Sequence, residues 1–377
     1  MIKSQLHILL DANLLQATGT IDLFRFMKPE NLLAASEFMA LAIISIVVAI
    51  YIHLFYKKQK YFYTVSINRH LESWISHLII EESSDNIQLP AKFYRILKNE
   101  MARHAAIAEL INCKKNFSGM VADNIVQLYL QLGLKKDSMK KIASPKWWIK
   151  ARGIQELYLM DQMDVLKPIY KNTNNRNEFV RMEAQTGVIN MTGFVGLRFL
   201  DVVSYPITEW QQIKLLEQLR LTPDKEDISD NIPGWLHSKN DSVVVFALKL
   251  ADDYLQLKVT ANVVECLEHP NEKVRAQAIR TLFRFEDPGT ADVLINCFDK
   301  EEFQNRALIL AALNSLATEE HTGFLTGLLD DENNTIKLKA AEVLAKCSPE
   351  GIKILQEKAI AEPDPFERIL KHVKSVK

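Results

Sequence analysis

Residues 269–285 read HPNEKVRAQAIRTLFRF, and they decide how the rest of the chain is interpreted. Val274, Ala278 and Leu282 fall on one face of a helix, with charged residues between them. A Pro and an Asn stand just before the periodic run, where a helix is expected to begin. The stretch predicts a turn followed by an amphipathic helix, and it carries no motif of catalytic chemistry.

The same pattern returns with a period of 31 residues. Aligned segments begin at residues 236, 267, 298 and 329 and read LHSKNDSVVVFALKLA, LEHPNEKVRAQAIRTL, FDKEEFQNRALILAAL and LDDENNTIKLKAAEVL. Their columns agree in character, as in the column Val245, Ala276, Ala307 and Leu338. One helix pair cannot bury its apolar face alone, whereas stacked pairs share a continuous core. The recurrence therefore predicts an all-α fold, an α-solenoid.

The repeat register extends toward the amino terminus. WWIKARGIQELYLM from residue 147 aligns with EFVRMEAQTGVINM from residue 178, and the unit that begins at Thr208 is about one residue out of step. The first helices of the units are expected to begin near Ile149, Val180, Gln211, Val243, Val274, Asn305 and Ile336. This register predicts about seven helix pairs.

At these residues the chain resembles the HEAT-repeat family. The resemblance rests on a turn Asn followed by Val-Arg-x-x-Ala, here Asn271, Val274, Arg275 and Ala278, and it covers roughly residues 144–360. Two units depart from the pattern, with Lys337 where the family has Arg and Asn305 where it has an aliphatic residue. The resemblance implies a curved superhelix whose concave face serves as a binding scaffold, without implying a particular ligand.

Composition agrees with a helical protein. Hydrophobic residues make up 48% and charged residues 25% of the 377 residues, and twelve Gly and twelve Pro are few for a turn-rich β fold. The net charge of −1 hides a basic half, with 17 basic and 9 acidic residues over 57–156, and an acidic remainder. The four cysteines form no CxxC pair, so we expect small core residues in a reducing compartment.

One segment has the features of a membrane span. Phe38–Tyr56 reads FMALAIISIVVAIYIHLFY, which contains no charged residue and as a helix nearly crosses a hydrocarbon core of roughly 30 Å. Lys57, Lys58 and Lys60 follow directly, and the positive-inside rule places them in the cytoplasm. We expect a single-pass protein of the inner (plasma) membrane with its amino terminus outside; the alternative is a buried core helix.

The sequence thus predicts five segments. They are an extracytoplasmic segment (1–36), a transmembrane helix (37–56), a helical membrane-proximal or capping region (57–143), a HEAT-like solenoid (144–362) and a carboxy-terminal tail (363–377). The join between the capping region and the first repeat looks similar to bacterial membrane-anchored HEAT proteins. Some of these accompany glycosyltransferases of cell-surface polysaccharide synthesis, so the resemblance implies a membrane glycosyltransferase as a partner.

The richest polar cluster lies at the start of the repeats. The stretch KKDSMKKIASPKWWIKAR contributes Lys135, Lys136, Lys140, Lys141, Lys146, Lys150 and Arg152. These side chains could bind phospholipid headgroups or another anionic partner; alternatively, they form a solvated face. Nucleic acid is not expected as a partner, because the distal half is acidic.

Aromatic residues concentrate in the first three units. They are Trp147, Trp148, Tyr158, Tyr170, Phe179 and Trp210, of which we take Trp147, Trp148, Tyr158 and Trp210 as candidate partner-binding residues. Aromatic side chains dominate binding hot spots, although core packing is the alternative for each of them. The expected function is non-catalytic scaffolding of a protein partner.

No residue set predicts catalysis, a cofactor or a metal site. The sequence has no HExxH, GxSxG, phosphate-loop or GxGxxG motif, and no His-Glu dipeptide of the kind that HEAT-repeat hydroxylases use for di-iron. The alternative function is a HEAT-like enzyme, a lyase or a glycosylase, with its site on the concave face. Converging carboxylates or histidines in a closed pocket would favour that alternative.

Overall fold

The computed structural model describes residues 29–81, 89–222, 227–287 and 289–376. These residues form helices and turns and include no β-strand. The chain divides into two compact units, residues 1–134 (unit 1) and residues 135–377 (unit 2). Most of the predicted extracytoplasmic segment (1–36) lies outside the described residues.

Unit 1 is built around one long helix. Its elements are α2 (Pro29–Glu81), α3 (Ala91–Ile96), α4 (Glu100–Asn116) and α5 (Met120–Gln131). α4 packs against both α2 and α5. Only the carboxy-terminal part of α2 contributes to this core, through Ile67, Leu71 and Ile75, which are at most 5% exposed.

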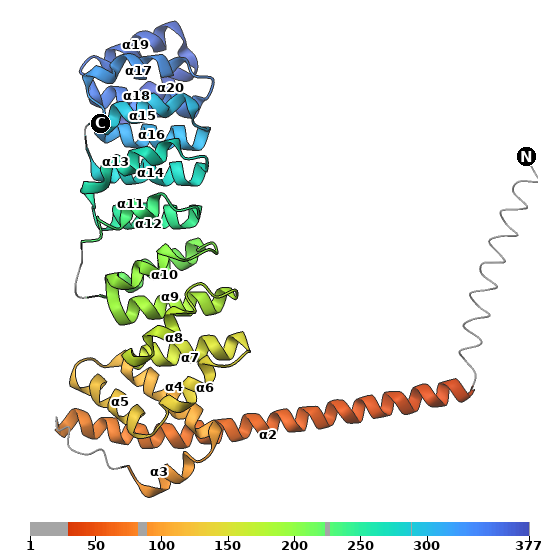
Figure 1. Ribbon diagram of the computed structural model, residues 1–377. Helices are drawn as coiled ribbons and strands as arrows, with labels where there is room; N and C mark the ends of the chain where they lie inside the picture. Colours follow the sequence, from red (N-terminus) through yellow and green to blue (C-terminus); the bar gives the residue numbers. More distant parts are fainter. Residues whose placement is uncertain (1–28, 82–88, 223–226, 288, 377) are drawn as a thin grey trace, which may run out of the picture. The chain divides into compact units, whose positions relative to one another are not determined.

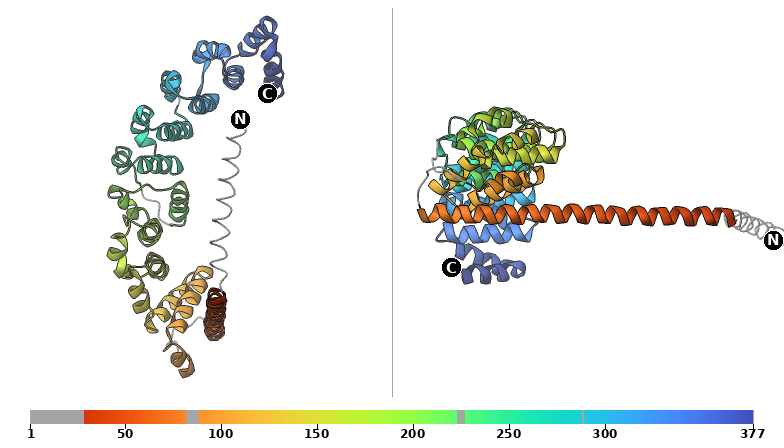
Figure 2. Two further views of the ribbon diagram at one scale, coloured as in Figure 1. Left: turned by 90° about the vertical axis from the view of Figure 1, so that its right-hand side faces the viewer. Right: turned by 90° about the horizontal axis from the view of Figure 1, so that it is seen from below.

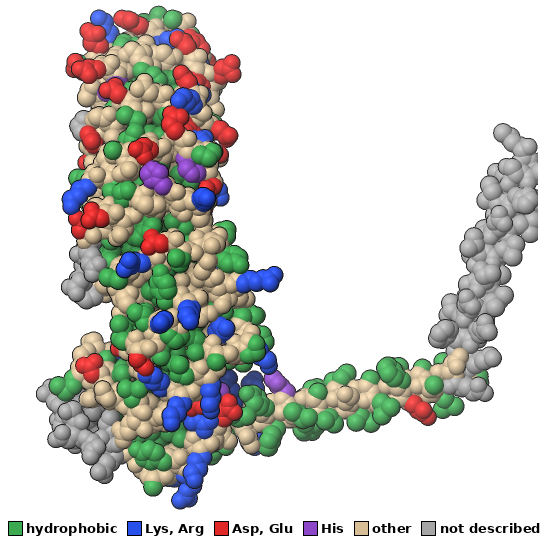
Figure 3. Space-filling model, in the orientation of Figure 1, with side chains coloured by type: hydrophobic (Ala, Val, Ile, Leu, Met, Phe, Trp, Pro, Cys, Tyr) green, Lys and Arg blue, Asp and Glu red, His purple; other side chains and the backbone are tan. Residues whose placement is uncertain are grey.

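The amino-terminal part of α2 leaves its apolar side chains uncovered. It extends away from α3, α4 and α5 (Figure 1), and green apolar side chains cover its visible surface (Figure 3). The stretch Asn31–Ser76 has a mean hydropathy of 2.6 in its most apolar window, and none of that window is buried. Among the described helices, α2 alone is long and apolar enough to cross a membrane.

In unit 2, a series of long helices follows the period of the sequence. We call them the first helices: α7 (Trp147–Leu159), α9 (Glu178–Thr192), α10 (Glu209–Arg220), α12 (Asp241–Asp253), α14 (Glu272–Phe285), α16 (Phe303–Leu316) and α18 (Asn334–Cys347). Their starting residues are 31 apart, except for a step of 32 between α10 and α12 (241 − 209). They follow one another in chain order along one stack (Figures 1 and 2). The predicted α-solenoid and its register are confirmed.

Shorter elements return the chain between first helices. They are η1 (Met163–Val165), α8 (Leu166–Tyr170), η2 (Gly193–Asp201), α11 (Ile232–Leu236), η3 (Leu257–Val259), α13 (Thr260–Glu265), η4 (Cys266–Glu268), α15 (Thr290–Cys297), η5 (Phe298–Lys300), η6 (Glu319–His321), α17 (Thr322–Gly327), η7 (Leu328–Asp330) and α19 (Gly351–Ala361). The return after α9 is a 3-10 helix that begins at Gly193, whose φ is 59°. A Cβ at Gly196 would lie 3.0 Å from the backbone of α9, so this glycine permits the close approach.

Side-chain caps fix where the first helices begin. Asn177, Thr208, Asn240, Asn271 and Asn333 each accept a hydrogen bond from a backbone N–H in the first turn that follows. Such caps satisfy donors that the helix leaves unpaired, at about 1 kcal/mol each. In these five units the turn residue ahead of the periodic run therefore fixes the start of the first helix, whereas α7 and α16 begin without a side-chain cap.

The aligned columns of the repeat have different environments. Ala247, Ala278, Ile309 and Ala340 are fully buried, and so are Ala251, Leu282, Leu313 and Leu344. The column Val245, Ala276, Ala307 and Leu338 is only half-buried. One face of each first helix therefore packs in the core, while this third column lies at the edge of a surface.

The cysteines behave as small core residues. Cys113, Cys266 and Cys297 are buried and Cys347 is half-buried, and all four are free thiols. Burial raises the pKa of the Cys266 and Cys297 thiols to about 11. These thiols are therefore protonated at neutral pH and poor nucleophiles.

Both ends of unit 2 differ from the predicted boundaries. The unit begins at Lys135 rather than at 144, because α6 (Lys135–Ile142) packs against α7. The predicted tail (363–377) is instead the helix α20 (Pro363–Val376), which packs against α18 and α19. Phe366, Ile369 and Val373 are spaced along one helical face and are at most 6% exposed, so α20 covers the last repeat.

Candidate binding surface

The residues at one equivalent position of the first helices form a row along unit 2. The second residue of each first helix is, in order, Trp148, Phe179, Trp210, Ser242, Lys273, Gln304 and Thr335. Equivalent positions in stacked repeats lie side by side, so these residues form one column, the N2 row. The row is aromatic in its first three units and polar in the remaining four.

The aromatic part of the N2 row is open to solvent. Trp148 is 52% exposed, Phe179 50% and Trp210 71%. Trp147 stacks on Phe179 with ring centroids 4.9 Å apart and meets Trp148 edge to face. Neighbouring large aromatic side chains on a surface are typical of sites that bind another molecule. Phe179 is absent from the sequence-based site set, although its spacing of 31 from both Trp148 and Trp210 is visible in the sequence.

Tyr158 does not belong to this surface. It is 4% exposed, and its hydroxyl donates a hydrogen bond of 3.0 Å to a carboxylate oxygen of Glu183. Burial is the main cause that raises the pKa of Tyr158. The prediction that Tyr158 contacts a partner is therefore wrong, because α9 covers its ring.

Lys141 does not belong to an exposed basic patch, although the sequence predicts that it does. Its Nζ lies 2.6 Å from Oε1 of Glu156, which also accepts hydrogen bonds from Ser138 and Arg152. Lys141 is 7% and Glu156 2% exposed. Lys141 thus neutralises a buried carboxylate between α6 and α7 and cannot contact an external anion.

The other patch residues divide into paired and unpaired groups. Lys135 forms an ion pair of 2.6 Å with Asp164, and Arg152 remains half-exposed while it bonds to Glu156. Lys136, Lys140 and Lys146 are exposed and Lys150 is partly exposed. Lys146 Nζ lies 5.8 Å from the ring centroid of Trp148, within cation–π range. Lys146 and Lys150 therefore adjoin the aromatic end of the N2 row.

The polar part of the N2 row lines a groove. The groove has a volume of about 1750 Å³, and its walls come from the amino-terminal turns of α10, α12, α14 and α16 and from the connections before α10 and α12. Ser242, Lys273 and Gln304 of the row line it, together with Val245, Ala276 and Ala307 of the half-buried column. Sequence reasoning missed this groove.

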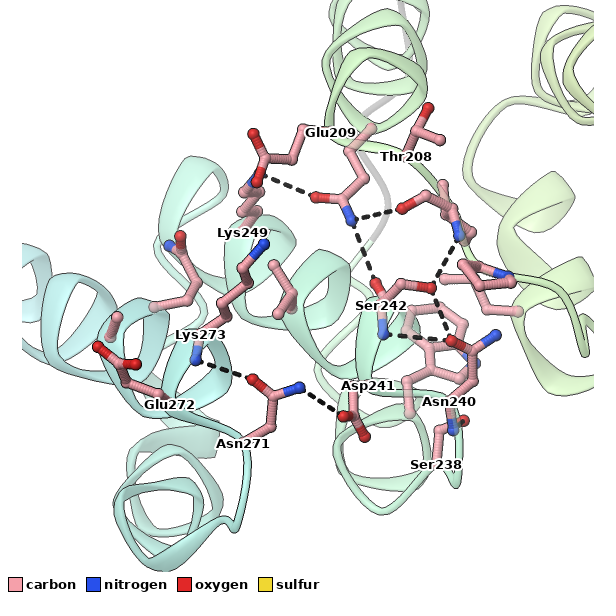
Figure 4. Close-up of a pocket in the computed structure, with 18 of the residues that line it drawn as sticks. Thr208, Glu209, Ser238, Asn240, Asp241, Ser242, Lys249, Asn271, Glu272 and Lys273 are labelled. Carbon is pink, nitrogen blue, oxygen red and sulfur yellow. Dashed lines mark hydrogen bonds between the residues drawn. The ribbon is translucent and has the colours of Figure 1, made fainter. Parts of the chain in front are cut away.

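Side-chain amides hold the floor of the groove (Figure 4). Gln212 donates to the backbone oxygens of Ile207 and Ser242, at 3.2 and 3.3 Å. Asn240 donates to the oxygen of Tyr205 at 3.0 Å and accepts from the Ser242 hydroxyl at 2.7 Å. These bonds join the start of α10 to the start of α12, so the groove is preformed.

Four cations line the groove, Lys239, Lys249, Lys273 and Arg280, and the last three project from first helices. Lys249 and Lys273 extend from α12 and α14 into the groove (Figure 4), and Arg280 lies one helix from Lys249 at the equivalent repeat position. Within the described parts of the chain, no carboxylate lies within ion-pair distance of any of the three. Lys249 Nζ donates instead to the amide oxygen of Gln212 at 2.8 Å.

The surroundings of Lys249 disfavour its charge. Burial lowers the pKa of the Lys249 ammonium; the charges of Glu209 and Asp253 raise it in part, and the smaller effect of Arg280 lowers it. The groove is also lined by four carboxylates, Asp201, Glu209, Asp241 and Glu272, and two of these accept hydrogen bonds from other side chains. Asp201 accepts from the indole N–H of Trp235, and Asp241 accepts from the side chain of Asn271.

The residues that line the groove decide which contacts it can offer. Its described lining contains no histidine and no cysteine. No cluster of three or more metal-ligating side chains occurs among the residues that the structure places. Its side chains can instead supply hydrogen bonds, positive charge and apolar contacts.

Comparison with known families identifies the repeat. Residues 260–345, which include α14, α16 and most of α18, match the family described as HEAT repeats. These residues are HEAT repeats. The predicted family is therefore confirmed for these units, and α7, α9, α10 and α12 continue the same helical period ahead of them.

Solved structures similar to this chain include an engineered protein, a designed repeat protein and a lyase complex. An engineered protein is 15% identical, with 75% of this chain and 86% of that chain covered and a TM-score of 0.37. A designed armadillo repeat protein is 14% identical, with 63% and 97% covered and a TM-score of 0.21. The complex of CpcE and CpcF of phycocyanin lyase from Nostoc sp. PCC7120 is 12% identical, with 67% and 92% covered and a TM-score of 0.24. No curated protein matches the sequence.

Proposed function

We propose that this protein is a membrane-anchored scaffold that binds another protein along the N2 row and its groove. The observation that carries the proposal is the exposed aromatic series Trp148, Phe179 and Trp210, which leads in register to a preformed groove. HEAT repeats offer long surfaces of this kind, because each repeat contributes one helix to a continuous face. A non-catalytic role is consistent with the mixed polar lining of the groove.

The proposed anchor is the uncovered part of α2. Its apolar side chains from Phe38 to Phe55 are exposed, which in water would be costly and in lipid is favourable. By the positive-inside rule, Lys57, Lys58 and Lys60 favour a cytoplasmic location for the residues that follow them. We propose an inner-membrane, single-pass arrangement with the amino terminus outside.

The class of partner is proposed from the resemblance noted in the sequence. Membrane-anchored HEAT proteins that accompany glycosyltransferases suggest a membrane glycosyltransferase of surface-polysaccharide assembly. An anchored scaffold and an integral enzyme meet in two dimensions, which raises their effective concentration. This partner class is consistent with a binding surface in the cytoplasm.

The proposal is tested by purifying the full-length protein, crosslinked in its native cells and solubilised in detergent, and identifying its partners by mass spectrometry. We expect one stoichiometric protein partner. The double substitution Trp148→Ala and Trp210→Ala should weaken binding by at least about 30-fold, which is the effect of losing about 2 kcal/mol at a single hot-spot aromatic, and recovery of the partner should fall with it. Ile360→Ala on α19, at a side chain that is 83% exposed, is the matched control and should leave recovery unchanged.

Two outcomes would count against the scaffold. Recovery of the protein alone after both mild and stringent washing would show that no stable partner exists. Equal partner recovery from the wild type and from the double tryptophan variant would place the binding surface elsewhere.

A further inference from the structure

We propose that a pocket between α7 and the turn ahead of α9 binds a phosphate monoester group, held by Lys150 and Arg176 beside the ring of Trp147. The pocket has a volume of about 360 Å³, and its lining includes these three residues and no carboxylate. This site goes beyond the proposed scaffold function. The phosphate can belong to a soluble molecule or to a lipid headgroup, and these two sources can be separated by experiment.

In the last three units, the fourth residue of the first helix is a cation that pairs with an acid. The acid stands in the turn ahead of the next long helix, 25 or 26 residues further along the chain (301 − 275, 331 − 306 and 362 − 337). The pairs are Arg275 with Glu301 (2.6 Å), Arg306 with Asp331, and Lys337 with Glu362 (3.9 Å). Lys150 is the fourth residue of α7 and therefore belongs to the same column.

The first unit lacks the acid of this column. The residues that lie 25 and 26 positions after Lys150 are Asn175 and Arg176, in the turn ahead of α9. Arg176 thus occupies the place that Glu301 occupies in a later unit. In the described parts of the chain, no ion pair joins Lys150 or Arg176 to an acid. A bound anion would supply the counter-charge that the other units provide for themselves.

The acid nearest to Arg176 in the sequence does not supply this counter-charge. Glu178 is exposed at the first position of α9 and does not line the pocket. It acts instead on Arg181, whose pKa is lowered by burial and raised in part by the charge of Glu178. Arg181 donates hydrogen bonds to the backbone oxygens of Asn175 and Arg176, at 2.8 and 3.0 Å. These bonds hold the turn that carries Arg176, so the pocket is preformed.

The charge and size of the pocket favour a phosphate monoester. Such a group carries about −1.5 to −2 charges at pH 7, which suits two cations better than the single charge of a carboxylate. Arg binds phosphate through two parallel N–H donors, and Lys binds it as a point charge. The pocket also has room for part of the attached molecule, since its volume lies in the range of small-molecule sites. Trp147, which is 42% exposed and stacks on Phe179, offers that part a flat apolar wall.

Occupation of the pocket can be measured by the rate at which Lys150 is acetylated. The full-length protein in a non-ionic detergent is treated with an N-hydroxysuccinimide ester of acetate, and each lysine is followed by peptide mass spectrometry. Phenyl phosphate is the soluble probe. We expect saturating phenyl phosphate to slow the acetylation of Lys150 and to leave unchanged that of Lys353, an exposed lysine of α19.

Lipid is tested as the source of the phosphate by the same reaction in nanodiscs. The discs contain phosphatidylcholine alone, phosphatidylcholine with phosphatidic acid, or phosphatidylcholine with the same amount of phosphatidylglycerol. Phosphatidic acid carries a phosphate monoester, whereas phosphatidylglycerol is an anionic diester. Protection of Lys150 by phosphatidic acid would identify a lipid headgroup as the ligand. Protection by phenyl phosphate without protection in any disc would identify a soluble ligand.

Variants locate the site. Arg176→Gln should weaken phenyl phosphate by about tenfold or more, because a charge-assisted hydrogen bond is lost. The matched control is Arg198→Gln, at an exposed arginine of η2 that forms no ion pair within the described residues. Trp147→Leu should weaken phenyl phosphate but not inorganic phosphate, because only phenyl phosphate has a ring that contacts the indole. Retained binding of inorganic phosphate would also show that the pocket of this variant is still folded.

The inference is overturned if no phosphate probe slows the acetylation of Lys150, or if Arg176→Gln leaves the protection unchanged. It is also overturned if Lys353 is protected equally, or if phosphatidylglycerol protects Lys150 as well as phosphatidic acid does. The scaffold proposal does not depend on these results. A cellular partner whose capture requires Trp148 and Trp210 would retain the scaffold even if the pocket binds no phosphate.

Discussion

At the scale of single residues, unit 2 uses its lysines for two different purposes. Lys141 is buried against Glu156, whereas Lys249 points into an open groove and bonds only to an amide. Their difference comes from the packing of α6 on α7, which closes over the first lysine, and from the groove, which leaves the second accessible.

The buried pair gives a stability prediction. Lys141→Met should destabilise the folded protein by about 3–5 kcal/mol, because it leaves the Glu156 carboxylate buried without its main counter-charge. Chemical denaturation followed by circular dichroism measures the change. Lys140→Met, at an exposed neighbour on the same helix, is the control and should change stability by less than about 0.5 kcal/mol. Equal stability of the two variants would show that Glu156 is not held as described.

At the scale of elements, α2 joins two environments in one continuous helix. Its last turns bury Ile67, Leu71 and Ile75 in unit 1, while the preceding apolar turns contact nothing in the described chain. The hydrophobic effect requires some cover for this surface. A bilayer is the cover that its length, its lack of charge and its lysine-rich end fit best.

Membrane insertion of α2 can be tested by introducing charged residues into its apolar part. Val47→Arg with Ile50→Arg places two charges in the middle of the span, at about 2.5–3.5 kcal/mol each on insertion scales. The wild type should remain in the membrane pellet after alkaline extraction, and the double variant should be released or degraded. Phe62→Arg, beyond the lysines, should stay in the pellet. A wild type that alkaline extraction releases completely would contradict the anchor.

At the scale of the whole molecule, the residues at one repeated position, the N2 row, together form a continuous surface of unit 2. The N2 row changes from aromatic to polar along unit 2, while the columns facing the core stay apolar throughout. Stability and recognition are thereby carried by different positions of the same repeat. Substitution along the row can alter the partner without disturbing the stack.

The sequence allowed much of this fold to be predicted, for a physical reason. Helix starts depend on local signals, such as Asn271 ahead of Val274, and core columns recur at a fixed period. The burial of Lys141 and Tyr158 could not be predicted, because it depends on which face of α7 meets α6 and α9. The groove depends on contacts between successive repeats, such as that from Gln212 to Ser242, and no local pattern marks them.

The central claim is that the N2 row and its groove form the binding surface. The most direct measurement is photo-crosslinking in native cells, with a benzophenone amino acid placed in turn at Trp148, Trp210, Lys273 and, as a control, Ile360. The account predicts that the first three positions capture the same protein and that Ile360, on α19, does not. Capture of nothing from the first three positions, or of the same protein equally from Ile360, would contradict it.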